Sequence, residues 1–341
     1  MKRMFIAVLA LAVVMAGASV ATAKRGGKHH HGAQAKERLF TLTPDPAGNP
    51  EGIAFDKRSK SFFVSITAGG AIYRGSLKSD TVEPLIAGEG ASVGIKVKRG
   101  KLYVAGGPTG SIKVYDLETK ALVAKFETGT GGFLNDLQVT RGGDVYVTDS
   151  FRPTLWHVTK EQVEAGSGAP QALDVSAIPY EAGEFNVNGI VAKGSSKLIV
   201  VDSNSGKLFR IKLGDDGGSI EDLDEITGAT VPGGDGMLLD RDKLVVVQGD
   251  PAQLSFLKLK RGAREAKLKR TQTSDKLRGP STVDAAKKLY LVVNADFDTS
   301  TKPFTVAGLP RKGGKGHHHG HGRGDDHGDD DHGHHRGDDD N

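Results

Sequence analysis

The sequence predicts an all-β fold, a six-bladed β-propeller in which the N-terminal strand closes the last blade. Short β-rich runs with alternating apolar and polar residues recur along the chain. They group into six units of about 40–50 residues, the length of a four-stranded propeller blade. Segments with helical periodicity are missing from the sequence, apart from one short turn near "KEQVEAG" at 160–166.

Each unit opens with a similar segment. The six openers are "PEGIAFD" at 50, "SVGIKVK" at 92, "LNDLQVT" at 134, "VNGIVAK" at 187, "GDGMLLD" at 234 and "PSTVDAA" at 280. Their third residues align and are separated by 42, 42, 53, 47 and 46 positions; they are Gly52, Gly94, Asp136, Gly189, Gly236 and Thr282. The absence of a seventh opener argues against a seven-bladed ring.

Two further apolar runs follow each opener, for example "SFFVSI" and "AIYRGSL", and weaker outer strands such as "TVEPLIA" follow most of these. The segment "RLFTLTP" at 38–44 precedes the first opener. We expect it to supply the outer strand of the last blade, because this pairing ties the two ends together and leaves no open sheet edge.

The ends of the chain lie outside this repeat. A basic start, a short apolar run and a small-x-small motif predict a signal peptide over 1–23, with cleavage after Ala23 and secretion. Residues 24–36 form a basic, His-containing linker, and 313–341 a His/Asp-rich tail; both are expected to be disordered because they offer little to bury. The propeller domain is therefore predicted over 37–312, without a membrane span in the mature chain.

Composition excludes several classes of function. The formal net charge is only +4, and the basic residues are scattered along the strands, which does not indicate nucleic-acid binding. There is no cysteine, so neither a disulfide nor a lipid anchor is expected. Of twelve histidines, only His157 lies in the predicted domain, where "TLWHVT" places it in a strand as a hydrogen-bonded structural residue. The tail histidines and carboxylates could bind transition metals weakly.

Polar residues recur at one position of the repeat, directly before the aligned third residue. In a propeller the first strand of each blade lines the central channel, so the residue before each aligned position lies near one mouth. These residues are Glu51, Val93, Asn135, Asn188, Asp235 and Ser281. The set is rich in oxygen atoms and contains no Lys or Arg, which suits a hard divalent cation. Ca²⁺ is favoured, with Mg²⁺, Mn²⁺ or Zn²⁺ as alternatives.

Turn formation is the alternative explanation, because Asn-Gly, Asp-Gly and Glu-Gly pairs are ordinary turn sequences. Their coincidence at a single phase of the repeat favours a site. The residues that follow the aligned positions are all apolar, as core packing requires.

The segments "NPEGIAFD", "LNDLQVT", "NVNGIV" and "GGDGMLLD", in this order and spacing, resemble the SMP-30/gluconolactonase/LRE-like (regucalcin-like) family over most of 45–300. The resemblance implies a six-bladed propeller with one divalent metal in its channel that hydrolyses sugar lactones and related esters. It implies Glu51, Asn188 and Asp235 as metal ligands, Asp235 also as general base, and Asn135 as a substrate-contacting residue.

One position departs from the pattern of the family. Its sugar lactonases usually carry an arginine two residues before the substrate-contacting asparagine, where this chain has Phe133. No clear counterpart exists for the second substrate-binding acid. A more apolar ligand is therefore expected, in a pocket that includes Phe133, Asn135 and Ser281.

The predicted function is a secreted, monomeric, metal-dependent hydrolase of lactones or esters. The metal would polarise the substrate carbonyl, while Asp235 deprotonates a water and Asn135 orients the substrate. The alternative is a non-enzymatic propeller, stabilised by the metal, that binds a ligand or serves as a scaffold.

Overall fold

The computed structural model describes residues 35–311, which form 24 β-strands and one helix. This confirms the predicted all-β class. Helix α1 (Lys160–Ala165) lies where the sequence predicts a helical turn, and a capping box between Thr159 and Gln162 begins it. Among residues 35–311, no helix is long and apolar enough to cross a membrane.

The strands occupy four positions within the repeats: first, second, third and outer. The first strands are β2 (Pro50–Asp56), β6 (Ile95–Lys98), β10 (Leu134–Val139), β14 (Val187–Ala192), β18 (Gly234–Asp240) and β22 (Pro280–Ala286). The second strands are β3 (Ser61–Ile66), β7 (Lys101–Ala105), β11 (Val145–Asp149), β15 (Lys197–Asp202), β19 (Lys243–Gln248) and β23 (Leu289–Asn294).

The third and outer strands come next. The third strands are β4 (Ile72–Ser76), β8 (Ser111–Asp116), β12 (Thr154–Val158), β16 (Leu208–Leu213), β20 (Gln253–Lys260) and β24 (Thr305–Pro310). The outer strands are β5 (Thr81–Ile86), β9 (Leu122–Glu127), β13 (Gln171–Asp174), β17 (Ile220–Ile226) and β21 (Glu265–Gln272), together with β1 (Arg38–Leu42) from the start of the described chain.

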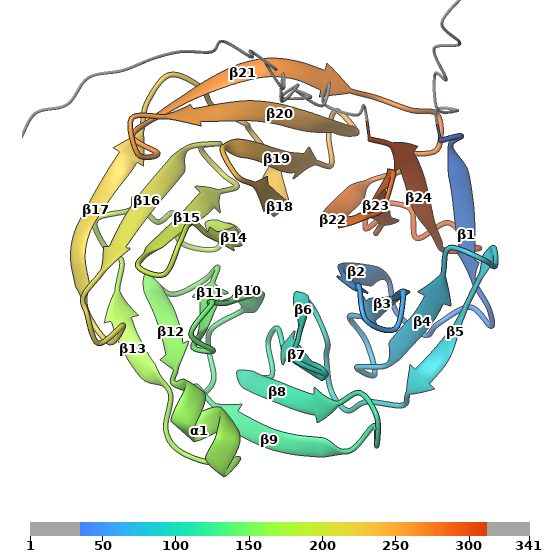
Figure 1. Ribbon diagram of the computed structural model, residues 1–341, viewed down its shortest axis with the longest axis horizontal. Helices are drawn as coiled ribbons and strands as arrows, with labels where there is room; N and C mark the ends of the chain where they lie inside the picture. Colours follow the sequence, from blue (N-terminus) through green and yellow to red (C-terminus); the bar gives the residue numbers. More distant parts are fainter. Residues whose placement is uncertain (1–34, 312–341) are drawn as a thin grey trace, which may run out of the picture. The chain divides into compact units, whose positions relative to one another are not determined.

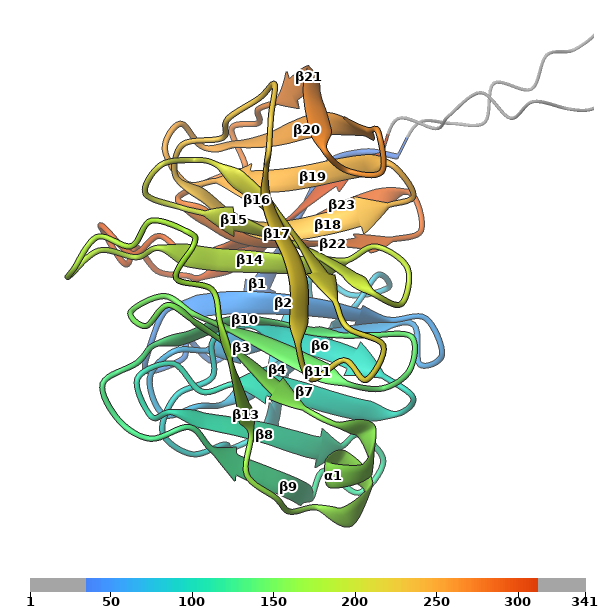
Figure 2. The ribbon, with the colours of Figure 1, turned by 90° about the vertical axis from the view of Figure 1, so that its left-hand side faces the viewer.

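The strands form four antiparallel sheets of four strands and one sheet of eight, arranged radially around a common axis (Figure 1). First strands contact first strands in a closed order, β2–β6–β10–β14–β18–β22–β2. Figure 2 shows that first strands such as β2 and β14 run along the axis, whereas the outer strand β17 crosses it steeply. This change of direction is the accumulated right-handed twist of each sheet.

Strand β1 joins the two ends of the described chain within the eight-stranded sheet. It pairs antiparallel with β24, from Arg38 opposite Gly308 to Thr41 opposite Thr305. On its other side only Thr41 and Leu42 pair with β5, in parallel. β1 therefore lies beside the last repeat in the antiparallel manner of an outer strand.

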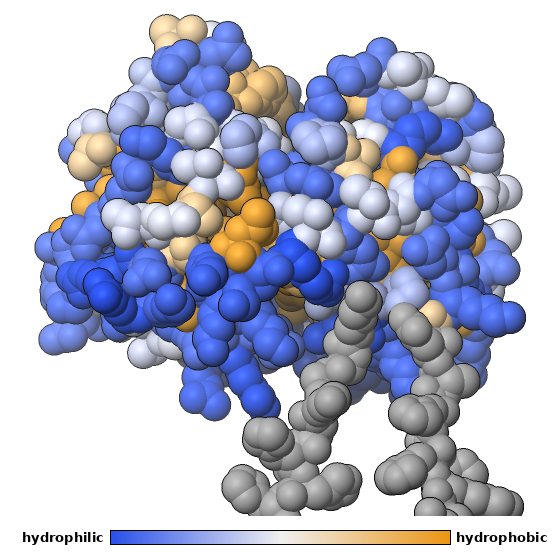
Figure 3. All heavy atoms as spheres, turned by 90° about the horizontal axis from the view of Figure 1, so that it is seen from above, coloured by the Kyte–Doolittle hydropathy of each residue, from blue (hydrophilic) through white to orange (hydrophobic). Residues whose placement is uncertain are grey.

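The hydrophobic core is divided among the spaces between neighbouring sheets. Six clusters of buried apolar side chains occupy these spaces, and each draws on two successive repeats. In the cluster between the first and last repeats, Phe40 of β1 packs edge-to-face on Phe62 of β3 at 5.2 Å between ring centroids. The outer surface around β21 is largely hydrophilic with scattered apolar residues (Figure 3).

The aligned glycines allow adjacent first strands to approach closely. A Cβ atom on Gly52 would lie 2.4 Å from the carbonyl oxygen of Val93, and one on Gly189 would lie 2.2 Å from that of Asp235. Each of these oxygens belongs to the residue that directly precedes the aligned position in the next repeat. Glycine is therefore required here by contact between neighbouring strands.

The predicted signal peptide, its cleavage after Ala23, most of the 24–36 linker and the 313–341 tail lie outside the described residues.

Candidate metal and substrate site in the channel

The predicted site residues lie at one end of the first strands, where each strand departs from regular pairing. In β2 the register with β3 shifts between Pro50 and Ile53, and the same shift recurs in β10, β14, β18 and β22. Such a bulge adds an unpaired residue and changes the direction of its side chain. The bulges contain Glu51, Asn135, Asn188, Asp235 and Ser281.

Three of these side chains present an oxygen that is buried and has no hydrogen-bond partner among the described residues. The atoms are Glu51 Oε2, Asn188 Oδ1 and Asp235 Oδ1. Glu51 and Asn188 are only 5% and 7% exposed. A buried oxygen without a partner is costly, so the three atoms together indicate that something else satisfies them.

The electrostatic interactions of the site link the three residues to Asp136. Burial raises the pKa of Glu51 well above its usual range, and the charges of Asp235 and Asp136 raise it further. Burial also raises the pKa of Asp235 to about 7; the Asp136 charge acts in the same direction, while the Asn188 side chain opposes it. Proximity of several carboxylates in a desolvated position is an arrangement that a cation would stabilise.

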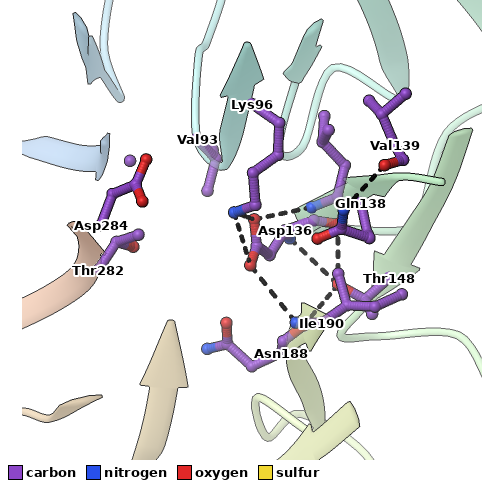
Figure 4. Close-up of polar contacts among 12 residues, drawn as sticks. Val93, Lys96, Asp136, Gln138, Val139, Thr148, Asn188, Ile190, Thr282 and Asp284 are labelled. Atoms are coloured by element: carbon purple, nitrogen blue, oxygen red, sulfur yellow. Dashed lines mark hydrogen bonds and ion pairs between the residues drawn. The ribbon is translucent and has the colours of Figure 1, made fainter. Parts of the chain in front are cut away.

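A lysine also enters the channel, although the six residues of the polar set include no Lys or Arg. Lys96 Nζ of β6 lies 3.1 Å from Asp136 Oδ1 of β10, and Figure 4 shows the two side chains pointing toward one another. The ammonium also lowers the pKa of Glu51. Asp136 is 3% exposed, so this ion pair is largely buried.

The sequence did not point to Lys96 because only the residues directly before the aligned positions were compared. It lies two residues after Gly94, and side chains two apart on a strand share a face. The corresponding residues of other first strands include Gln138 and Asp284, which with Lys96 line a cavity of about 240 Å³. Asp284 accepts hydrogen bonds from its neighbours' backbone, Phe55 N at 2.7 Å and Ala285 N at 2.6 Å.

The other predicted polar residues are buried and hydrogen-bonded at the same end of the first strands. Asn135 is 4% exposed, and its amide donates to Ser150 Oγ at 2.9 Å. The Ser281 hydroxyl donates to the backbone oxygen of Glu51 at 2.7 Å, which connects β22 to β2. Val93 is buried and adds no polar atom.

The predicted ligands fit an oxygen-coordinated divalent cation. They offer two carboxylates and one amide, each with a buried oxygen free to bind. Among residues 35–311 there is no group of three or more His, Cys, Asp or Glu residues positioned to hold a metal. The third predicted ligand is an asparagine, and Asp136 is paired with Lys96.

Phe133 lies next to this site, at the bend before β10. Its backbone N–H donates to Asp149 Oδ1 at 2.9 Å. The Asp149 carboxylate also accepts from Phe151 N, Arg152 N and the Arg152 side chain, which identifies it as a turn residue at the end of β11.

His157 lies in β12 and is 1% exposed, as expected of a structural residue. The expected hydrogen bond is not well formed: neither ring nitrogen has an aligned partner among the described residues, although the side chain of Gln171 interacts with the ring and partly offsets the lowering of its pKa by burial. The ring instead stacks on Tyr146 at 4.6 Å between centroids. Gln171, its cross-strand neighbour, directs its amide nitrogen to the Gly218 carbonyl.

Comparisons with known proteins support the fold. No protein-family model matches the sequence, and no curated protein matches it significantly. The structure is similar to a gluconolactonase from Xanthomonas campestris, with a TM-score of 0.58 and 17% identity over 80% of this chain and 89% of that one.

It is also similar to a calcium-binding protein, regucalcin, from Agrobacterium tumefaciens, with a TM-score of 0.59 and 16% identity over 82% of this chain and 96% of that one. A luciferin-regenerating enzyme gives a TM-score of 0.59 and 12% identity with the same coverage. These similarities confirm, at the level of the fold, the resemblance to the SMP-30/gluconolactonase/LRE-like propellers.

Proposed function

We propose that residues 35–311 form a six-bladed β-propeller closed by β1. The support is the closed order of contacts among six first strands. The eight-stranded sheet then consists of two blades, with β1 as the outer strand of the last one. The parallel contact of β1 with β5 involves only two residue pairs, which is small for a true continuation of the sheet.

We further propose that the protein is a divalent-metal-dependent hydrolase of lactones or related esters. The observation that carries this proposal is the trio of buried, unpartnered oxygens on Glu51, Asn188 and Asp235. Oxygen-only ligands favour Ca²⁺, with Mg²⁺ or Mn²⁺ next, and Zn²⁺ less so because His and Cys are missing from the set. The names of the gluconolactonase and regucalcin neighbours agree with this chemistry.

The residues of the chain would divide the work as follows. Glu51, Asn188 and Asp235 would hold the cation, which supplies charge stabilisation to a substrate carbonyl oxygen. Asp235 would also accept a proton from the attacking water. Asn135 has two amide hydrogens, and Ser150 accepts one of them, so the other can orient a substrate oxygen.

A second candidate function is a non-enzymatic ligand-binding or scaffold propeller stabilised by the metal. Phe133 favours it, since it replaces the arginine that the family resemblance leads one to expect. The ammonium of Lys96 already supplies positive charge within the acidic cluster, which counts against dependence on a metal in either function.

Assays with a panel of lactones and aryl esters, with and without chelator, would separate the two functions. We expect turnover that requires the metal and falls by at least ~10²-fold in Asp235→Asn, the lower end of the general acid–base contribution. Asp284→Asn, a change to another channel carboxylate, is the matched control and should retain turnover. Metal binding without turnover of any ester or lactone would exclude the hydrolase and leave the second candidate.

We propose that the protein is exported after cleavage at Ala23 and acts as a monomer. The basic and apolar N-terminal sequence supports export. The His/Asp-rich segment 313–341 is proposed to bind transition metals weakly and independently of the channel.

A further inference from the structure

Three phenylalanine side chains form an aromatic cluster at the channel end that carries the candidate site. Phe133, Phe151 and Phe185 each contact the other two, with ring centroids 5.0–5.6 Å apart. These separations are typical of favourable aromatic pairs. Phe151 and Phe185 are nevertheless 43% and 45% exposed, so the cluster presents aromatic surface to the outside. We call these three residues the Phe cluster.

The Phe cluster adjoins the candidate site through the chain itself. Phe133 precedes Asn135 by two residues, and Phe185 precedes Asn188 by three. Phe151 follows Ser150, whose hydroxyl accepts the hydrogen bond from Asn135. All three phenylalanines therefore lie on the bends that lead into or out of the site.

Hydrogen bonds from backbone and side-chain groups hold these loops together. Ser150 N donates to the Phe133 carbonyl at 2.9 Å, and Asn186 Nδ2 donates to the Ser150 carbonyl at 3.1 Å. The fully buried Asp149 carboxylate accepts from both Phe133 N and Phe151 N. The aromatic surface is therefore fixed in place before any ligand arrives, which lowers the entropic cost of binding.

The charged group next to Phe151 in the sequence is already engaged. Arg152 Nε lies 2.7 Å from Asp149 Oδ2, and its Nη1 donates to the Thr128 carbonyl at 3.1 Å. This guanidinium is therefore committed to the protein and does not offer its charge to a polyhydroxylated substrate. An aromatic surface beside a guanidinium that is already paired favours apolar groups.

We propose that the Phe cluster is the subsite for an apolar substituent, so that the preferred substrates are lactones or esters bearing an alkyl or aryl group. This inference rests on the proposed function for the reacting carbonyl. The carbonyl lies at the oxygen-rich site, and the substituent extends over Phe151 and Phe185. Sugar lactones, whose hydroxyl groups would be desolvated against phenyl rings, are disfavoured.

Binding can be measured apart from turnover with lactams, which are isosteres of lactones and resist hydrolysis. The probes are 5-methyl- and 5-hexyl-2-pyrrolidinone, with the Ca²⁺-loaded full chain. Trp156, the single tryptophan of the sequence, donates to Asp149 Oδ2 at 3.2 Å and so reports on this region by fluorescence. Each buried methylene strengthens binding by up to ~4-fold. We expect the hexyl lactam to bind at least ~10-fold more tightly than the methyl lactam, since the cluster covers only part of the chain.

The variant Phe151→Ser/Phe185→Ser should abolish the preference for the hexyl lactam. Phe297→Ser is the matched control: Phe297 is 55% exposed but makes no contact with the Phe cluster, so the preference should persist. Phe151→Leu/Phe185→Leu keeps an apolar surface and should retain most of the preference. Thermal unfolding of each variant shows that the fold is intact.

Equal affinity of the two lactams for the unaltered protein would overturn the inference, even if lactones were hydrolysed. A preference that survives Phe151→Ser/Phe185→Ser in a folded variant would also overturn it. A chain-length preference among the lactams, with no turnover of any lactone or ester of the panel, would support the subsite and reject the proposed hydrolase. The two ideas therefore fail separately.

Discussion

Lys96 places a positive charge among carboxylates that are otherwise suited to a divalent cation. Its ammonium is bonded to Asp136 and acts on Glu51 as well. We expect Lys96→Met to bind Ca²⁺ more tightly by about tenfold or more, equivalent to ~1.4 kcal/mol or more. Removing one partner of a buried ion pair leaves an uncompensated charge. The metal-free variant should therefore unfold at a lower temperature than the unaltered protein.

Calorimetric titration with Ca²⁺ and thermal unfolding would check this prediction. Lys113→Met is the matched control, because Lys113 is also buried, yet it lies on the third strand β8 and donates to the Glu89 and Ala91 carbonyls. It should leave the affinity for Ca²⁺ unchanged. Equal affinities of Lys96→Met and the unaltered protein would show that the ammonium does not compete with a channel cation.

His157 gives the stability a defined dependence on pH. Burial lowers its pKa below the ordinary value of 6.5, so the unfolded chain takes up a proton at a pH where the folded chain does not. Stability from this residue is thus complete above pH 6.5 and is lost as the pH falls toward the lowered pKa.

Replacement of His157 by Phe removes this titration while keeping an aromatic ring against Tyr146. We expect the unfolding free energy of His157→Phe, relative to the unaltered protein, to increase between pH 7.5 and pH 5. Urea unfolding at the two pH values measures it, and the other histidines cancel because both proteins contain them. A difference that is constant with pH would contradict the prediction.

At the scale of a strand, the glycine that four of the six openers have at the aligned position is required by contact between neighbouring strands. Gly189→Ala would place a Cβ atom 2.2 Å from the Asp235 carbonyl oxygen. We expect this overpacking to reduce the unfolding free energy by ~1–3 kcal/mol. Gly142→Ala is the control, since its Cβ atom would meet only Thr140 Oγ1 at 3.7 Å and it should change stability little. Equal stability of the two variants in urea would contradict the contact argument.

The strands were predictable because each repeat expresses the same alternation. The openers at 50, 234 and 280 coincide with β2, β18 and β22 residue for residue. The bulges were not predictable, because alternation describes regular pairing and an inserted residue breaks it. The sequence indicated Glu51, Asn188 and Asp235, which directly precede the aligned position. It did not indicate Asp136, because the aligned position itself is mainly glycine and has no side chain to enter the channel in those repeats.

The Phe cluster could not be found from sequence spacing either. Phe133 was singled out only through its departure from a family pattern. The pairing of β10 with β11 brings Phe151 beside Phe133, and Phe185 comes from the next repeat along the chain. An exposed phenylalanine in a turn-rich segment was the available signal, and it does not show which bends meet.

At the scale of the whole molecule, β1 contributes to the core between the first and last repeats. Phe40 is fully buried, whereas its neighbour Leu39 is 40% exposed on the opposite face of the strand. We expect Phe40→Ala to lower the unfolding free energy by ~3–5 kcal/mol. Leu39→Ala, the matched control on the same strand, should lower it by far less, and thermal or urea unfolding of both variants is the measurement. Similar losses for the two would mean that β1 does not secure the junction.

The pairing of β1 with β24 also means that the fold should not depend on which repeat comes first in the polypeptide. Because Arg38 lies opposite Gly308, a short linker could connect the two ends of the described region. New ends could then be opened at exposed turn residues such as 141–142. A circularly permuted protein of this kind would retain every strand pair of the original. A covalent linker would then join β1 to β24, in addition to their hydrogen bonds.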